Sequence, residues 1–470
     1  MKCAEDRPTG RLNAMQRIMR DWSSLHPYNA THTYKLAGPL DLPRLRAAIG
    51  LTYAELGLGL VHLTPDGLGY WHETDRAPEV CVVPGGEEAG RRWTEHLSWQ
   101  LNQPFERPDC RPLRFSVFDA GPQAHYLSAT YDHWVADSVA ARLVLRHVLG
   151  CYCGLEIPEN REPLDLYPGT YREVFGPRLR PLHLVAAMLS SLKQWNRNHA
   201  ARQVAYLSAS QMAVSYELYS TAPGTVSRLR EFARAHGGTV HDVILAALGR
   251  AMAEFLPRRA GRDRSRDLAL GSIVDTRADA GVDLSRTFGT FLAYYLVRCT
   301  PEQGTSLAAL THHVARLTRP IKAGHHYLDS LVNMKVVNAL WPHLGEATRG
   351  SFMRRALPMT AGVSNVLLRE PWIERNRDRI LGYSRCSPTG PMLPLVLAPT
   401  TLGDQMNIGV TYRITGFSQA KIDGIMEMFL DQIQTPWKSD STSRCHGRKH
   451  APRRAAPASP AAGQLTTSSF

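Results

Sequence analysis

The stretch YDHWVADS at residues 131–138 decides the fold, because its histidine stands four residues before an aspartate where a strand pattern gives way to a helix pattern. Residues 125–131 mix aromatic, β-branched and small side chains as strands do, and residues 139–149 repeat apolar side chains at helical spacing. A connection held at both ends by rigid elements can aim a side chain into a cleft. We therefore expect His133 to lie at a functional site, with Asp137 close to it.

The chemistry of imidazole makes His133 the leading candidate for a general base. Its ordinary pKa near 6.5 leaves the ring largely neutral at neutral pH, so it can take a proton from an attacking hydroxyl or amine. Such a step contributes roughly a hundred- to ten-thousand-fold in rate. Asp137 would orient the ring or hold the shape of the connection. From these two residues alone, a histidine satisfied by hydrogen bonds near the core remains the alternative.

Several segments resemble the condensation domains of nonribosomal peptide synthetases and the related wax ester synthase and chloramphenicol acetyltransferase families. Residues 131–138 resemble the His-His-x-x-x-Asp-Gly motif of that superfamily. The resemblance runs from about residue 11 to about residue 433, in the family's order. The other segments that carry it are 13–17, 26–29, 40–45, 239–248, 273–277, 288–291, 363–366 and 409–413.

The motif departs from the family at two positions. Asp132 stands in place of the first histidine, and Ser138 stands in place of the glycine. Ser138 adds a side chain that would narrow the passage for an acceptor. The later His-Gln-Asp and Arg-Asp-x-Ser segments of condensation domains have no good copy here. The pattern therefore favours a divergent relative over a standard peptide-bond-forming domain.

The resemblance implies an α/β fold with two chloramphenicol acetyltransferase-like domains, arranged as a V-shaped pseudo-dimer with the active site in the tunnel between them. The alternation of strand and helix patterns also favours layered α/β packing. The predicted parts are a flexible N-terminus at 1–10, an N-terminal domain with the motif at 11–180, a crossing linker and helix at 181–214, a C-terminal domain at 215–437 and a disordered basic tail at 438–470.

Composition limits the class of protein. The 470 residues are 43% hydrophobic, which is ample for large cores. Neither a run of 18 apolar residues nor the apolar stretch of a secretory signal is present, so we expect a cytoplasmic protein. Eight cysteines are too sparse for a disulfide scaffold. Residues 182–202 read as a packed amphipathic helix, with peripheral membrane contact as the alternative.

The formal charge of +13 does not indicate nucleic-acid binding, because no zinc-finger spacing, aromatic RNA-binding pattern or recognition helix accompanies it. Six basic residues face one acidic residue within 438–470, which accounts for part of the excess. The remaining excess would suit an acidic carrier protein or the phosphates of coenzyme A.

Two further patterns are weaker. The adjacent histidines at 312–313 and 325–326 lack carboxylates at metal-ligand spacing, so we expect no metal site. The sequence Gly362-Val363-Ser364 lacks the second glycine of a nucleophile elbow, which makes a serine hydrolase improbable.

The function implied by the resemblance is acyl transfer without a covalent enzyme intermediate. His133 would activate a small-molecule alcohol or amine acceptor to attack a thioester, while Asp137 and Arg277 form a supporting ion pair. No bound cofactor is expected, because the acyl thioester of coenzyme A or phosphopantetheine is a co-substrate. The candidate oxyanion or substrate contacts are Ser364, Asn365, Trp134 and Ser138.

The expected partner is therefore acyl-CoA or an acyl carrier protein, supplied in trans because no carrier or adenylation segment is apparent in the chain. The expected setting is the biosynthesis of a lipid or other natural product, as an ester or amide. Two alternatives stay open: a wax ester or glycerolipid synthase-like enzyme, and a non-catalytic condensation-like binding module.

Overall fold

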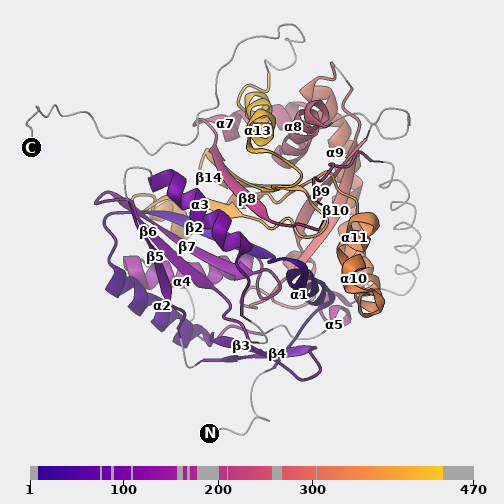
Figure 1. The fold of residues 1–470 in the computed structure, drawn as a ribbon. Helices are drawn as coiled ribbons and strands as arrows, with labels where there is room; N and C mark the ends of the chain where they lie inside the picture. Colours follow the sequence, from indigo (N-terminus) through magenta and orange to yellow (C-terminus); the bar gives the residue numbers. More distant parts are fainter. Residues whose placement is uncertain are drawn as a thin grey trace, which may run out of the picture.

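Two separate β-sheets organise the chain, and helices pack against both of them (Figure 1). The computed structural model describes residues 9–437 apart from 75–76, 86–88, 107–108, 156–161, 167–169, 177–200, 209, 257–266 and 303. The predicted two-lobed α/β architecture is confirmed. The predicted helix at 182–202 and the tail at 438–470 lie largely or wholly outside the described residues.

The first sheet forms the centre of the N-terminal lobe. Helix α4 contacts two of its strands, β2 and β7, and α2 packs against α4 on the same side (Figure 1). The strand order of this first sheet is β13 (Ile380–Cys386), β2 (Asn29–Ala37), β7 (Ala124–Asp132), β6 (Arg114–Asp119) and β5 (Val80–Val83). The helices of this lobe are α1 (Ala14–Leu25), α2 (Leu42–Leu56), α3 (Ala89–Asn102), α4 (Ser138–Cys153) and α5 (Tyr171–Phe175). A small sheet of β1 (Gly10–Arg11), β4 (Gly69–Glu73) and β3 (Leu60–Leu63) lies at its edge.

The second sheet forms the centre of the C-terminal lobe, and α8 packs between α9 and α13. Its strand order is β10 (Leu292–Cys299), β9 (Leu268–Asp275), β11 (Ala361–Val363), β14 (Leu395–Leu402), β15 (Gln405–Arg413) and β8 (Val214–Ser220), with β12 (Val366–Leu368) paired to β14. Its helices are α7 (Thr225–Ala235), α8 (Val240–Phe255), α9 (Leu307–Ala323), α10 (Asp329–Leu340), α11 (Glu346–Ala356), α12 (Pro371–Arg375) and α13 (Gln419–Gln434).

Local capping residues explain where two of the helices begin. The Thr239 hydroxyl accepts a hydrogen bond from the Asp242 N–H, and the Asp242 carboxylate accepts one from the Thr239 N–H, which together start α8. Asp41 caps α2 in a similar way, and Gly57 ends that helix with a φ of 65°. Both α2 and α8 therefore begin directly after a side chain that caps them.

Strand β13 crosses from one lobe to the other. It belongs to the predicted C-terminal domain at 215–437, yet it pairs antiparallel with β2 of the first sheet. Its backbone passes very close to β15: a Cβ atom built at Gly409 would lie 1.9 Å from the Arg385 carbonyl oxygen. Only glycine leaves room for that approach. The boundary predicted between the domains therefore does not separate their sheets.

Helix α1 also joins the lobes, because it packs against α10 (Figure 1). The Asn13 side-chain amide donates to the Thr290 carbonyl oxygen at 2.9 Å, and the Asn338 amide donates to the Ala14 carbonyl oxygen at 2.7 Å. These contacts hold the two lobes on either side of a shared interior.

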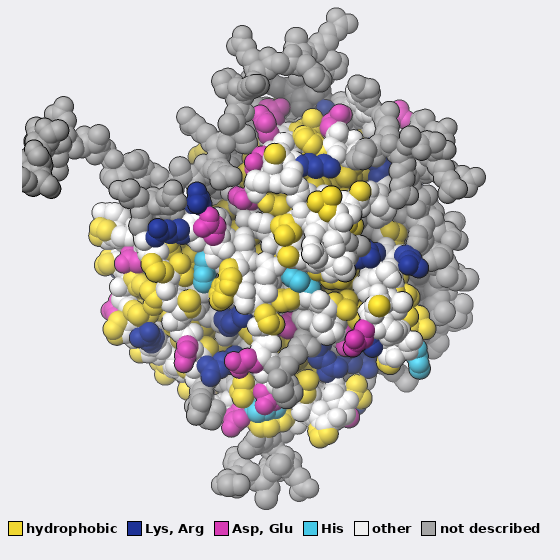
Figure 2. All heavy atoms as spheres, viewed as in Figure 1, with side chains coloured by type: hydrophobic (Ala, Val, Ile, Leu, Met, Phe, Trp, Pro, Cys, Tyr) yellow, Lys and Arg dark blue, Asp and Glu magenta, His cyan; other side chains and the backbone are white. Residues whose placement is uncertain are grey.

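Among the described residues, no helix is long and apolar enough to cross a membrane. On the face shown in Figure 2, basic and acidic side chains are interspersed among hydrophobic ones.

Candidate active site

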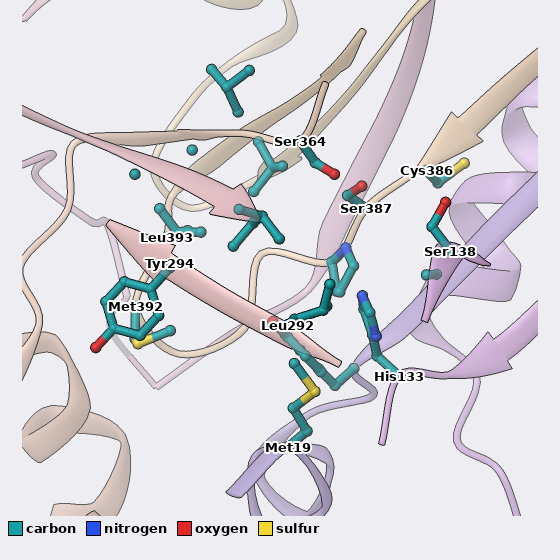
Figure 3. Close-up of a pocket in the computed structure, with 18 of the residues that line it drawn as sticks. Met19, His133, Ser138, Leu292, Tyr294, Ser364, Cys386, Ser387, Met392 and Leu393 are labelled. Atoms are coloured by element: carbon teal, nitrogen blue, oxygen red, sulfur yellow. The ribbon is translucent and has the colours of Figure 1, made fainter. Parts of the chain in front are cut away.

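A pocket of about 90 Å³ lies between the two lobes. One side comes from α1, β2 and the connection after β7, and the other comes from β9, β10, β11 and the segment that follows β13. Figure 3 shows His133 and Ser138 at one side of this pocket, with Ser364 and Ser387 above them and Met19 below. The motif that decides the fold therefore lies at the junction of the lobes.

His133 is held in place by its backbone and by one ring nitrogen. Its N–H donates to the Tyr28 carbonyl oxygen at 3.0 Å, and its carbonyl oxygen accepts from the Thr290 hydroxyl at 3.0 Å. Its Nδ1 lies 3.1 Å from the Ala136 carbonyl oxygen, so the tautomer that makes this hydrogen bond carries its proton on Nδ1. The Nε2 lone pair is then free to accept a proton, since the described part of the chain provides it no hydrogen-bond donor.

The surroundings keep the His133 ring neutral. Burial lowers the pKa of His133, and the nearby Arg385 cation lowers it further, against the opposing effects of Asp137 and the Ala136 carbonyl. The ring stacks on Tyr28, with centroids 5.6 Å apart and planes inclined by 27°. A neutral imidazole with a free Nε2 is the form that a general base requires.

Asp137 points away from the pocket and binds Arg277 with both carboxylate oxygens. The Arg277 nitrogens lie 2.7 Å from Oδ2 and 3.0 Å from Oδ1. The carboxylate also accepts from the N–H groups of Val139, Ala140 and Phe291, at 3.0, 3.0 and 2.9 Å. Burial acts to raise the pKa of Asp137, but the Arg277 cation and these hydrogen bonds outweigh it, so that pKa lies below its ordinary value.

The contacts of Asp137 are with Arg277 and with backbone N–H groups, outside the pocket lining. The side chain caps the start of α4 and ties it to the β9–β10 region of the other lobe. It therefore fixes the backbone from which His133 extends, without itself lining the pocket.

The other predicted site residues divide into two pairs. Ser138 and Ser364 both line the pocket, and the Ser138 hydroxyl accepts a hydrogen bond from Arg142 at 3.0 Å. Trp134 is 4% exposed and packs in the core, and neither it nor Asn365 is among the pocket-lining residues. The Asn365 Oδ1 is buried and has no hydrogen-bond partner among the described residues.

A polar network that the sequence does not indicate lies at the pocket wall. The His32 ring contacts the Tyr131 hydroxyl at 3.1 Å and the Tyr383 hydroxyl at 2.5 Å. Burial, followed by the nearby cations, holds the pKa of His32 well below its ordinary value. Both His32 and Arg385 line the pocket. Arg385 lies on β13, whose pairing with β2 leaves no local signal in the sequence.

The paired histidines form no metal centre in the described part of the chain, where no cluster of three metal-ligating side chains occurs. His312 and His313 are exposed on α9. The His325 ring instead lies 2.6 Å from the Asp279 carboxylate, and neither residue lines the pocket.

Comparison with known proteins identifies the family. Residues 85–333, more than half of the chain, match the model of the condensation domain family. The protein therefore belongs to the condensation domain family. It is 32% identical over 126 residues to the probable nonribosomal peptide synthetase CymA of Salinispora arenicola. That match covers 27% of this chain and 2% of CymA, so this chain spans only a small part of that protein's length.

Solved structures of similar shape show the same fold across most of the chain. The condensation domain of the Monacolin K polyketide synthase MokA has a TM-score of 0.63 at 14% identity, with 92% of this chain and 98% of that chain covered. SgcC5 of Streptomyces globisporus has a TM-score of 0.59 at 16% identity, with 92% and 99% covered. The X-domain from teicoplanin biosynthesis has a TM-score of 0.56 at 18% identity, with 93% and 96% covered. At these identities the likeness concerns the fold.

Proposed function

We propose that the protein transfers an acyl group from a thioester to an amine or hydroxyl, with His133 as the general base. The observation that carries this proposal is the orientation of the His133 ring, whose Nδ1 is engaged by the Ala136 carbonyl while Nε2 stays free beside the pocket. Membership of the condensation domain family supports the same reaction class.

In the proposed reaction, the acceptor's nitrogen or oxygen attacks the thioester carbonyl as His133 Nε2 takes its proton. The new C–N or C–O bond forms while the carbonyl electrons move onto oxygen. Collapse of this intermediate breaks the C–S bond, and the leaving thiolate takes the proton back from His133. Ser364, whose hydroxyl faces the pocket, is a donor that would stabilise the oxyanion.

The donor in this proposal is the thioester of coenzyme A or of a carrier protein's phosphopantetheine arm, with no further cofactor. The similarity to a probable nonribosomal peptide synthetase supports a carrier protein. The product would be an ester or amide of a natural product or lipid. A wax ester or glycerolipid synthase-like activity would use the same site with a long-chain alcohol.

A binding module without turnover is the second candidate. The fold also serves in the teicoplanin X-domain, for which a complex with OxyB has been solved. The departures at Asp132 and Ser138 are the observations that favour it. Against it stands the neutral, oriented His133 ring, since a binding module has no need of a free Nε2.

Intact-mass detection of product tests the proposal, with a panel of acyl-CoA and acyl carrier protein donors offered to mixed amines and alcohols. We expect product with the parent protein and at least a hundredfold less with His133→Ala. His313→Ala, which alters an exposed histidine on α9, is the matched control and should retain activity. Product that survives His133→Ala would move the chemistry elsewhere. Binding of donors without product from any combination would favour the binding module.

A further inference from the structure

Arg385 is a buried cation at the wall of the pocket. Its side chain is 3% exposed, yet it is one of the residues that line the cavity. It lies on β13, directly opposite His32 in the pairing with β2. The close approach of β13 to Gly409 fixes the backbone at this position.

All the contacts that Arg385 makes in the described part of the chain are to neutral oxygens. Its Nε donates to the Thr400 hydroxyl at 2.9 Å, and its Nη2 donates to the carbonyl oxygens of Pro399, at 3.3 Å, and Ser364. Its Nη1 makes only a long contact of 3.4 Å with the Ser364 hydroxyl. Nη1 is thus the guanidinium nitrogen that the protein engages least.

Two other arginines near the site, both only slightly exposed, have the carboxylate partner that Arg385 lacks. Arg277 pairs with Asp137, and Arg142 pairs with Glu370 at 3.1 Å. Among the described residues, no carboxylate lies within ion-pair distance of Arg385. Burial lowers the pKa of Arg385, but a guanidinium remains protonated at neutral pH, so its charge stays unbalanced. An unpaired buried charge costs stability, and a bound anion would remove that cost.

Most of the remaining pocket wall is apolar. Residues from both lobes form this wall: Met15, Met19, Trp22, Ile273, Leu292, Met359, Met392 and Leu393. Several of them are methionines, whose flexible thioether side chains adapt to differently shaped apolar groups. The cavity therefore offers a proton acceptor, a cation and an adaptable apolar surface to one small molecule.

We propose that this pocket binds an acceptor with a free carboxylate, held by Arg385, and an apolar side chain, held by the methionine-rich wall. The class is an apolar amino or hydroxy acid that is free in solution rather than attached to a carrier. Its amine or hydroxyl faces His133 and loses a proton there as the new bond to the acyl carbon forms. The carboxylate is unchanged by the reaction. This inference rests on the proposed function only where it makes the bound acid the acyl acceptor. Binding of the acid itself can be measured without acyl transfer.

Isothermal titration calorimetry with two probes tests the inference. The probes are 3-phenylpropanoate and its neutral amide, which share an apolar body and differ in charge. With the parent protein, we expect the carboxylate to bind at least tenfold more tightly than the amide. Arg385→Gln should remove that preference. Arg385→Lys should keep part of it, because lysine retains the positive charge but lacks the planar guanidinium that binds a carboxylate through two N–H groups. Arg298→Gln, which alters a paired arginine outside the pocket, should leave both affinities within twofold of the parent.

The comparison of the two probes on the parent protein is enough to contradict the inference. The test therefore does not depend on whether the variants fold. Equal binding of the two probes, or binding of neither, would overturn it. Failure of the proposed function has a different signature: carboxylate binding that depends on Arg385, together with no product that depends on His133. Circular dichroism of each variant establishes that it is folded before its affinity is interpreted.

Discussion

Asp137 and Arg277 are 140 positions apart in the sequence, yet they form a bidentate ion pair with nitrogen–oxygen distances of 2.7 and 3.0 Å. The same carboxylate caps α4 and accepts the Phe291 N–H of the other lobe. One buried side chain thus fixes both the start of a helix and the junction between lobes.

Asp137→Asn should destabilise the protein strongly, because it removes the bidentate partner of the largely buried Arg277 cation and leaves it only the more exposed Asp275 carboxylate, at 3.2 Å. We expect the free energy of unfolding to fall by about 3–5 kcal/mol, measured by urea denaturation. Asp378→Asn, at a carboxylate whose side chain is 76% exposed, should change it by less than about 0.5 kcal/mol. A folded Asp137→Asn protein with parental stability and no activity would instead assign this residue to the chemistry.

The pH profile of acyl transfer should report the His133 pKa, which burial lowers below the ordinary 6.5. Only the neutral ring can act as the base, so kcat/KM should fall as pH drops through the folded pKa. We therefore expect the acid limb to have its midpoint below pH 6.5. The rate should be constant between pH 6.5 and the start of any alkaline limb. A midpoint above 6.5 would show that a different group controls the reaction.

Gly409→Ala should prevent β13 and β15 from approaching each other, because the added Cβ would lie 1.9 Å from the Arg385 carbonyl oxygen. Backbone must move to accept it, and we expect a loss of about 3 kcal/mol or more in thermal or urea unfolding. Gly50→Ala is the matched control, since its nearest neighbour would be 4.0 Å away and it lies inside α2. That change should be neutral or stabilise by about 0.5–1 kcal/mol. Equal stability of the two variants would contradict the close approach.

His241 should make stability depend on mildly acidic pH. Burial and then the Lys322 cation lower its pKa to about 4, while the unfolded chain takes up the proton near pH 6.5. The unfolded state thus binds more protons in this window, and stability is lost as pH falls from about 6.5 toward 4. His241→Gln should reduce the proton uptake on unfolding by up to one proton, measured by urea unfolding at pH 7.5 and 5.0. His313→Gln, at an exposed position, should leave the pH dependence unchanged.

The elements with local signals could be predicted from the sequence, and those that depend on distant partners could not. The ends of helices α2 and α8 are marked in the sequence by residues that cap them. Asp41 and Thr239 cap the starts of the two helices, Gly57 ends α2, and each acts on residues a few positions away. The motif likewise placed His133 where a strand meets a helix. By contrast, β13 is short, and its place beside β2 depends on residues more than 300 positions earlier in the chain.

The same distinction applies to the site. Family resemblance indicated Arg277 as the partner of Asp137, and the structure contains that pair. Nothing in the motif indicated Arg385, because its proposed role depends on a carboxylate partner that the described part of the chain does not provide. Trp134, adjacent to His133, is expected near substrate from the motif, but it lies in the turn after β7 and packs in the core.

The crossing of β13 also limits how the protein can be divided. Without that strand, β2 would become the edge of its sheet, and the backbone of residues 31–36 would lose its partner on one side. An open edge of that length is a template for pairing with other chains. A fragment that ends before residue 380 should therefore aggregate rather than fold as an isolated N-terminal lobe.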